Sequence, residues 1–298
     1  MIEQFKGTNL IDFMDRFSNE EKCKKYLLEM KWKDGFICDK CGHYHYWRKK
    51  DNPYVRVCKS CRHINSVTAN TLFHKLKFPL RKAFLILFEM STTTKSCSST
   101  VMARKLGINQ KTAWLFMSKV RKAMSSSGDH PLEGVCEVDE ILIGGKQEGK
   151  RGRGAKGKKK ASILIEKDNN GGIKRAYGMK IENFSTKELR KIFDRHICKK
   201  AKVDTDLWKS YTPLKEEWEI EQSKSNPKEN FRSIHRFIQQ LKGWIRGIFH
   251  KIDDRYLQGY LDEFCFRLNR HLFRNTIFHT LVGKMMIHQP MTRAKLVV

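Results

Sequence analysis

The stretch CEVDEILIGGKQEGKRGRGAKGKKKASILIEKD, residues 136–168, joins two apolar runs through a block of Gly, Lys and Arg. Three acids, Glu137, Asp139 and Glu140, lie inside the first run. Alternate residues of a strand face the same side, so we expect Glu137, Asp139 and Ile141 to share one face. A carboxylate on a buried strand is costly unless it is paired or binds a cation. The stretch therefore predicts two strands joined by a basic hairpin, with an ion-paired or functional acid on the first.

The composition is that of a globular protein with an unusual charge. The 298 residues contain 60 Lys and Arg against 32 Asp and Glu, a formal net charge of +28. Such an excess indicates a polyanionic partner, most often nucleic acid. An anionic membrane surface is the alternative, but the sequence has no apolar run near the roughly 18 residues of a membrane span and no signal peptide. We expect no membrane partner and a cytoplasmic, nucleoid-associated protein, or a nuclear one if the source is eukaryotic.

Four of the nine cysteines form two C-x-x-C pairs. Cys38 pairs with Cys41 and Cys58 with Cys61, and 16 residues separate the two pairs. Four thiolates on paired tight turns predict a closed tetrahedral site for structural Zn²⁺, a zinc ribbon. The alternative is two disulfides or incidental cysteines, which an intracellular location disfavours.

Residues 96–126 predict two helices joined by a turn at Gly107. Ala103 and Ala113 are small enough to let the helices pack closely, the spacing of a helix-turn-helix. An ordinary helical hairpin is the alternative. On the second helix, polar and basic residues are expected to face outward, toward base edges and phosphates. These residues are Asn109, Gln110, Lys111, Thr112, Lys119 and Arg121.

A second predicted strand, KVDTDLW, offers Asp204 and Asp206 on one shared face. A downstream helix has His235 and Lys242 seven residues apart, so two turns bring them to the same side. Carboxylates on two strands with a ligand on a helix suit a two-metal phosphoryl-transfer site. The alternative is that Asp139 and Asp206 pair only with the abundant Lys and Arg.

Motifs along nearly the whole chain resemble those of one family. DGFICDKCG, CRHINSVTANTLFH and LGINQKTAW resemble its amino-terminal half. EVDEILIGGK with its RGRGAKGKK tail, DTDLWKSY, SIHRFIQQLKGWIRGIFHK and YLDEFCFRLNRH resemble its catalytic half. The family is the insertion-sequence transposases with an N-terminal zinc ribbon and a DDE-type, ISXO2-like core, bacterial relatives of the eukaryotic Merlin elements. The number and order of the motifs make this resemblance specific.

The resemblance implies an RNase H-like enzyme that cuts double-stranded DNA at the terminal inverted repeats of its element and joins the ends to target DNA. Asp139 and Asp206 match the two catalytic aspartates, His235 the third position, and Lys242 the basic residue after it. The third position of a DDE enzyme is normally Glu, and Glu229 is the alternative carboxylate. We expect Mg²⁺, or Mn²⁺ because it accepts nitrogen ligands more readily. The resemblance also implies a homodimer or higher oligomer on paired ends.

The expected architecture is a multidomain α+β protein. An N-terminal helix and zinc ribbon are expected at 1–75, and a helix-turn-helix DNA-binding domain at 76–128. An α/β RNase H-like domain with a helical C-terminal part is expected at 129–298, after a Ser, Gly and Pro-rich break at 125–134.

The basic block between the two predicted strands is interpreted as a phosphate-tracking loop, since glycine permits close approach to DNA. A solvated hairpin is the alternative. The candidate DNA contacts are Arg151, Arg153, Lys156, Lys158, Lys159 and Lys160. The alternative function for the whole chain is a catalytically inactive or repurposed DNA-binding regulator with the same fold.

Overall fold

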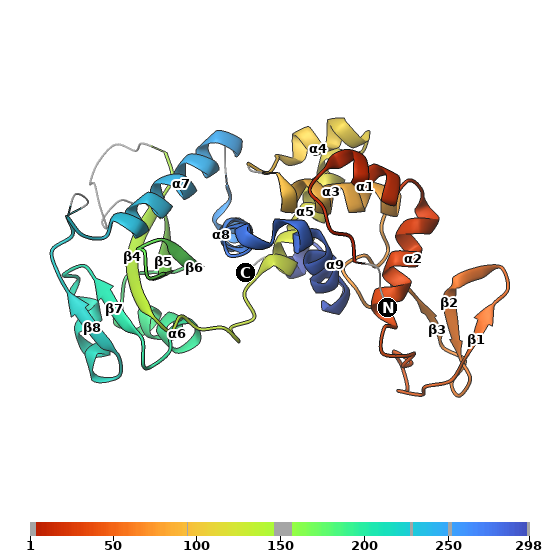
Figure 1. Cartoon of the computed structure of the whole chain (residues 1–298), viewed down its shortest axis with the longest axis horizontal. Helices are drawn as coiled ribbons and strands as arrows, with labels where there is room; N and C mark the ends of the chain where they lie inside the picture. Colours follow the sequence, from red (N-terminus) through yellow and green to blue (C-terminus); the bar gives the residue numbers. More distant parts are fainter. Residues whose placement is uncertain (1–3, 94, 146–156, 227–228, 250–251, 297–298) are drawn as a thin grey trace. The chain divides into compact units, whose positions relative to one another are not determined.

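The computed structural model describes residues 4–93, 95–145, 157–226, 229–249 and 252–296. The chain forms two compact units, one from Met1–Met124 with Leu272–Val297 and the other from Ser125–His271. The ranges expected at 1–75 and 76–128 therefore lie in one unit, and the unit that contains the expected catalytic domain ends before residue 272. Each unit is described by itself below (Figure 1).

The first unit is helical apart from the ribbon. Its helices are α1 (Leu10–Arg16), α2 (Glu20–Lys31), α3 (Leu80–Thr92), α4 (Ser99–Leu106), α5 (Gln110–Met124) and α9 (Ile277–Ile287). Phe278 of α9 is fully buried, and its ring centroid lies 5.3 Å from that of Phe13 and 5.4 Å from that of Phe17. Such aromatic contacts bury large areas. This packing explains why the C-terminal helix joins the first unit rather than the domain that precedes it in sequence.

The ribbon is a three-stranded antiparallel sheet in the order β1-β2-β3. Its strands are β1 (Tyr46–Lys49), β2 (Asn52–Cys58) and β3 (Ile64–Ser66). One face of the sheet packs inward: Arg56 pairs across strands with Asn65, and both are buried. The guanidinium carbon of Arg56 lies 5.1 Å from the ring of Trp32 and 4.8 Å from the ring of Tyr46. This cation–π sandwich lets a charged residue serve as the core of a small domain.

The second unit is built on a five-stranded sheet in the order β6-β5-β4-β7-β8. Its strands are β4 (Val135–Ile143), β5 (Lys159–Lys167), β6 (Ile173–Lys180), β7 (Lys202–Thr205) and β8 (Glu219–Gln222). The first three strands are antiparallel, whereas β7 and β8 run parallel to β4. The predicted α+β fold, with a zinc ribbon preceding an α/β domain, is confirmed.

Helices cover both faces of this sheet. The helical elements are α6 (Thr186–His196), the 3-10 helix η2 (Lys209–Glu216), α7 (Arg232–Ile248) and α8 (Leu257–Leu268). Ile141 of β4 packs in the cluster that includes α7 and α8, whereas Val138 packs in the cluster that includes α6 and η2. The predicted alternation along the first strand is therefore correct, and Asp139 lies on the α7 face.

Side-chain hydrogen bonds cap helix α6 and cover the edge strand β6 of this unit. Ser185 caps α6, its side chain accepting the backbone N–H of Glu188. The edge strand β6 is covered: Asn269 donates to the carbonyl of Ala176 and accepts its N–H at 2.9 and 2.8 Å. An edge whose backbone groups are already bonded is protected against pairing with another chain.

Candidate active site and zinc centre

The four predicted zinc cysteines come together. Their Sγ atoms all lie within 4.8 Å of one another, with Cys38 to Cys61 and Cys41 to Cys58 each at 3.6 Å. Zn–S bonds of about 2.3 Å in a tetrahedron separate sulfur atoms by roughly 3.8 Å, so the spacing fits Zn²⁺. Desolvation raises the pKa of Cys38, but backbone N–H groups of Lys40 and Cys41 outweigh it and lower that pKa to about 6.

The two knuckles have the same backbone. The N–H of Gly42 donates to the carbonyl of Cys38 at 3.0 Å, and the N–H of Arg62 donates to that of Cys58 at 3.1 Å. Both donors have positive φ, +73° and +58°. Glycine adopts this conformation readily, whereas at Arg62 it is unfavourable. The turn therefore keeps a strained residue, as expected where a ligand set determines the backbone.

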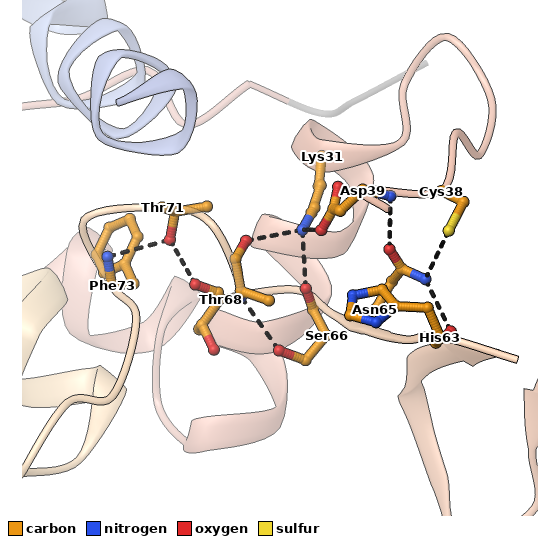
Figure 2. A network of polar contacts seen from close by, with 10 residues as sticks. Lys31, Cys38, Asp39, His63, Asn65, Ser66, Thr68, Thr71 and Phe73 are labelled. Atoms are coloured by element: carbon orange, nitrogen blue, oxygen red, sulfur yellow. Dashed lines mark hydrogen bonds and ion pairs between the residues drawn. The ribbon is translucent and has the colours of Figure 1, made fainter. Parts of the chain in front are cut away.

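Asn65 and Lys31 hold the zinc site to its surroundings (Figure 2). The Asn65 side chain accepts the N–H of Asp39 at 2.8 Å and donates to the carbonyl of His63 at 3.0 Å and to Cys38 Sγ at 3.8 Å. It thus joins the two knuckles. Lys31 Nζ, at the end of α2, bonds the Asp39 carboxylate and the Ser66 carbonyl, each at 3.0 Å. Residues outside the ligand set commonly orient metal ligands in this way.

In the second unit, the parallel pairing of β4 with β7 sets the positions of the two aspartates. Val138 of β4 pairs with Thr205 of β7, and Asp139 and Asp206 are the next residues of these two neighbouring segments. Both are partly buried. Asp206 Oδ1 accepts the N–H of Trp208 at 3.0 Å, which fixes its side chain where β7 ends. Two carboxylates from distant segments are therefore neighbours in the middle of the sheet, where β7 ends beside β4.

Gln222 bonds the backbone of Asp206 and Tyr211 bonds Glu140, the residue after Asp139, and sequence reasoning missed both contacts. Gln222 Nε2, on β8, donates to the carbonyls of Asp206 and Trp208, each at 3.1 Å. The hydroxyl of Tyr211 donates to Glu140 Oε1. Burial, then the charges of Glu140, Asp139 and Asp206, raise the pKa of Tyr211 well above its ordinary value. The signal for Tyr211 is its position in the DTDLWKSY motif; strand β8, with the sequence EIEQ, gave no clear signal.

His235 and Lys242 both lie on α7, as predicted. Burial lowers the pKa of Lys242, an effect opposed by the negative charge of Asp139 and reinforced by Lys158 and Arg246. His235 Nε2 lies 2.9 Å from Ser225 Oγ. Among the described residues only the four cysteines are close enough together to hold a metal. Asp139, Asp206 and His235 therefore do not form a closed ligand set in this structure.

Glu137 attaches α7 to the sheet. Its Oε2 accepts the N–H of Ile234 in the first turn of α7 at 3.0 Å, and its Oε1 lies 3.0 Å from Lys167 Nζ. Lys167 Nζ is also 3.4 Å from Asp204 Oδ2. Desolvation lowers the pKa of Lys167, but Glu137 and then Asp204 outweigh it and raise that pKa. Because Ile234 precedes His235, this buried network sets where α7 presents its side chains.

Acids outside the predicted ligand set of Asp139, Asp206 and His235 line a cavity of about 870 Å³. Glu137, Asp204 and Glu221 are in register across β4, β7 and β8, and all three line this cavity. Glu229, the alternative third carboxylate, lines it as well. Asp139, Asp206 and His235 are not among its lining residues. The structure thus groups Glu229 with Glu137 and Asp204 rather than with the predicted catalytic aspartates.

The structure describes only some of the residues predicted to bind DNA from the basic block. Arg151, Arg153 and Lys156 lie outside the described residues, whereas Lys159 and Lys160 belong to β5. Lys158 precedes that strand, and all three lysines are partly buried. Lys160 Nζ donates to the carbonyl of Glu182 at 2.8 Å.

The two helices predicted at 96–126 are present, with Gly107 in the left-handed conformation ending α4. Asn109, Gln110 and Lys111 are exposed and Thr112 is partly buried, with Asn109 accepting the N–H of Lys111 at 2.8 Å. Arg121 was expected to face outward, and this is wrong: it is only 4% exposed. The apolar positions of α5 place it on the packed side of the helix.

Two family models match the sequence. The ISXO2-like transposase domain matches residues 131–269, and the transposase zinc-ribbon domain matches residues 18–64. Together the two matched ranges cover more than half of the chain. The protein therefore belongs to the zinc-ribbon transposases with an ISXO2-like DDE domain, the family that its motifs resemble.

Two solved structures are also similar. A chain in the crystal structure of a pre-cleavage Mos1 transpososome has 11% identity and a TM-score of 0.25, covering 64% of this chain and 75% of that chain. A chain in the Mos1 transposase paired-end complex with left transposon end has 12% identity and a TM-score of 0.22, covering 68% and 78%. These TM-scores are too low to establish a shared fold. Comparison with curated proteins gave no match.

Among the described residues, no helix is both long and apolar enough to cross a membrane.

Proposed function

We propose that this transposase binds the terminal inverted repeats of its insertion sequence and catalyses metal-dependent DNA cleavage and strand transfer. The observation that carries the proposal is the parallel register of the inner strands β4 and β7, which makes Asp139 and Asp206 neighbours in the middle of the sheet. Carboxylate oxygens are the ligands that Mg²⁺ prefers, so the donor set fits a divalent ion. The substrate is double-stranded DNA, so the activity is expected at the nucleoid in the cytoplasm, or in the nucleus if the source is eukaryotic.

In this proposal Asp139 and Asp206 hold the catalytic Mg²⁺ or Mn²⁺, and His235 completes the set. The bound ions would activate water or a 3′-hydroxyl and stabilise the leaving oxygen. His235 must exchange its contact with Ser225 for the ion, and its nitrogen donor favours Mn²⁺ over Mg²⁺. Lys242, whose charge interacts with Asp139, would contact a phosphate beside the cut. Tyr211 and Gln222 would keep the aspartates in place without touching DNA.

The remaining DNA contacts are assigned to the first unit and to the basic block. The exposed start of α5, with Asn109, Gln110 and Lys111, has the geometry to meet base edges and phosphates. Transposition joins two element ends, so the active form is proposed to be a dimer or higher oligomer on paired ends.

A cleavage assay tests the proposal. The protein is incubated with Mg²⁺ or Mn²⁺ and a labelled duplex from the inverted repeats that flank its coding region. The wild type should cut the duplex, and Asp139→Asn should bind it unchanged but cut it more than about a hundredfold more slowly, because a direct ligand should matter more than an outer-shell residue. Asp129→Asn, an exposed aspartate in the linker, is the control. Equal cutting by wild type and Asp139→Asn would remove Asp139 from the site.

A second candidate function is DNA binding without chemistry. The observation in its favour is His235, which replaces the usual acid and contacts Ser225 rather than the aspartates. The same assay separates the two functions. His235→Ala should abolish strand transfer and leave DNA binding intact if the protein is an enzyme. Specific binding with no cutting by the wild type in either ion would favour the regulator.

A further inference from the structure

The zinc ribbon has an outer face that the proposed function does not use. Trp47, Val57 and Ile64 are in register across β1, β2 and β3, one residue away from the buried row of Arg56 and Asn65. Alternate residues face opposite sides of a sheet, so these three form the outer row. Trp47 is 50% exposed, Ile64 is 59% exposed and Val57 is partly buried. We name Trp47, Val57 and Ile64 the ribbon face; exposed apolar groups of this kind mark interaction sites.

The charge around the ribbon face selects an anionic partner. Residues 40–64 contain seven Lys and Arg but only one acid, Asp51, whose carboxylate is 3.1 Å from Lys49 Nζ. Six of the seven basic residues are exposed, Arg56 being the exception. The excess remains positive after the net charge of about −2 that four thiolates and one Zn²⁺ carry. A second copy of the ribbon would bring like charges together, which disfavours self-association at this face.

The apolar side chains of the ribbon face favour single-stranded over double-stranded DNA. A duplex presents phosphates on its outside and keeps its base faces stacked within, so an apolar sheet face would desolvate phosphates with no compensation. Unpaired strands expose their base faces, and aromatic side chains flanked by cations bind such bases. Lys59 Nζ lies 5.9 Å from the centroid of the Trp47 ring, which puts a cation beside the stacking surface.

We propose that the ribbon face binds single-stranded DNA, with a base stacked on Trp47 and its neighbouring phosphate near Lys59. Val57 and Ile64 pack against the next sugar and base. The proposal rests on the proposed function for its biological setting, because cleavage and strand joining leave unpaired ends. It does not depend on the aspartates.

The test is fluorescence anisotropy with the full-length, zinc-loaded protein. The probes are a labelled strand of about 12 nucleotides and the matching duplex. Trp47→Ala should weaken binding of the single strand about tenfold, the loss expected for one stacked base, and leave duplex binding within about twofold. Trp47→Phe should restore most of the affinity. Ile11→Ala, which removes an apolar residue 70% exposed on α1, is the matched control and should change neither probe.

Three results would overturn the proposal. Wild-type affinity for the single strand in Trp47→Ala is the first, and an equal loss for both probes is the second. A change in oligomeric state with DNA binding intact is the third, because it would assign the face to a second copy. Zinc content is measured for each variant; if Trp47→Ala loses zinc, Ile64→Ser replaces it and should weaken single-strand binding while duplex binding stays within about twofold. Asp139→Asn should bind the strand like the wild type, so failure of catalysis and failure of this proposal are distinguishable.

Discussion

The zinc centre and the acidic site differ in how their ligands are brought together. All four zinc ligands come from residues 38–61, on two turns of the same geometry, and their sulfur atoms are already within bonding range of one ion. The acidic site draws on β4, the end of β7 and α7, and its three predicted ligands are not yet a closed set. A structural site must be complete on folding, whereas a catalytic site keeps open positions for substrate. The zinc centre is thus determined by residues close together in the sequence, whereas the acidic site is determined by the register of the sheet.

The largest expected effect is at the zinc centre. Cys58→Ser removes one of the four thiolate ligands, and structural zinc is worth about 10–16 kcal/mol in zinc-finger peptides. Bound zinc should be lost and the ribbon should unfold. Metal analysis measures the zinc and hydrogen exchange the unfolding, with Cys198→Ser, outside the four, as the control. Amides of β4 and β5 should stay protected; loss of their protection would show that the two sites are not independent.

The next largest effect concerns Glu137, which attaches α7 to the sheet. Glu137→Ala leaves Lys167 without its nearest carboxylate, and breaking a buried pair costs about 3–5 kcal/mol. The unfolding free energy of the second unit should fall by that amount in urea titrations.

Two further variants examine the same contact. Glu133→Ala, at an exposed position just before β4, should change little. The double variant Glu137→Gln with Lys167→Met keeps an acceptor for the Ile234 N–H and removes both charges, so it should recover much of the loss. No recovery would mean that the ion pair itself, rather than an uncompensated charge, holds α7.

A smaller effect is expected at Asn65, beside the zinc ligands. Asn65→Ala removes the bonds to Asp39, His63 and Cys38 Sγ, and loss of such a supporting residue lowers metal affinity about 10–100-fold. Competition with a chromophoric chelator measures the affinity. Ser60→Ala, exposed within the second knuckle, is the control.

The conservative change Asn65→Asp sharpens this prediction. It keeps the acceptor for the Asp39 N–H, loses the donor to sulfur and adds a negative charge beside the thiolates. Its affinity should therefore be no better than that of Asn65→Ala. Wild-type affinity in either variant would mean that the knuckles alone determine the site.

The sequence was most informative where the signal is local. The cysteine spacing and the alternation along β4 each depend on residues close in the chain, and both predictions are confirmed. The position of α9 could not be predicted, because Phe278 packs with Phe13 and Phe17 from the other end of the chain. Strand β8 was missed since its alternating EIEQ resembles a solvated segment.

The same reasoning explains the limits at the candidate site. Asp139 and Asp206 could be chosen from their strands and from the family resemblance. The roles of Tyr211 and Gln222 depend on which strands are neighbours, which no local pattern states. Arg121 was misplaced because a basic residue was assumed to face water, although its helix position puts it inside. The role of Glu137 could not be predicted, since its partner Ile234 is 97 residues away.

The most direct test of the central claim is to locate the catalytic ion. In the zinc-loaded protein bound to element-end DNA, Mg²⁺ is replaced by Fe²⁺, and ascorbate with peroxide then cuts the polypeptide next to the iron. The account predicts peptide breaks beside Asp139 and Asp206 that disappear in Asp139→Asn and persist in Asp204→Asn. Breaks confined to other parts of the chain, or unchanged breaks in Asp139→Asn, would contradict it.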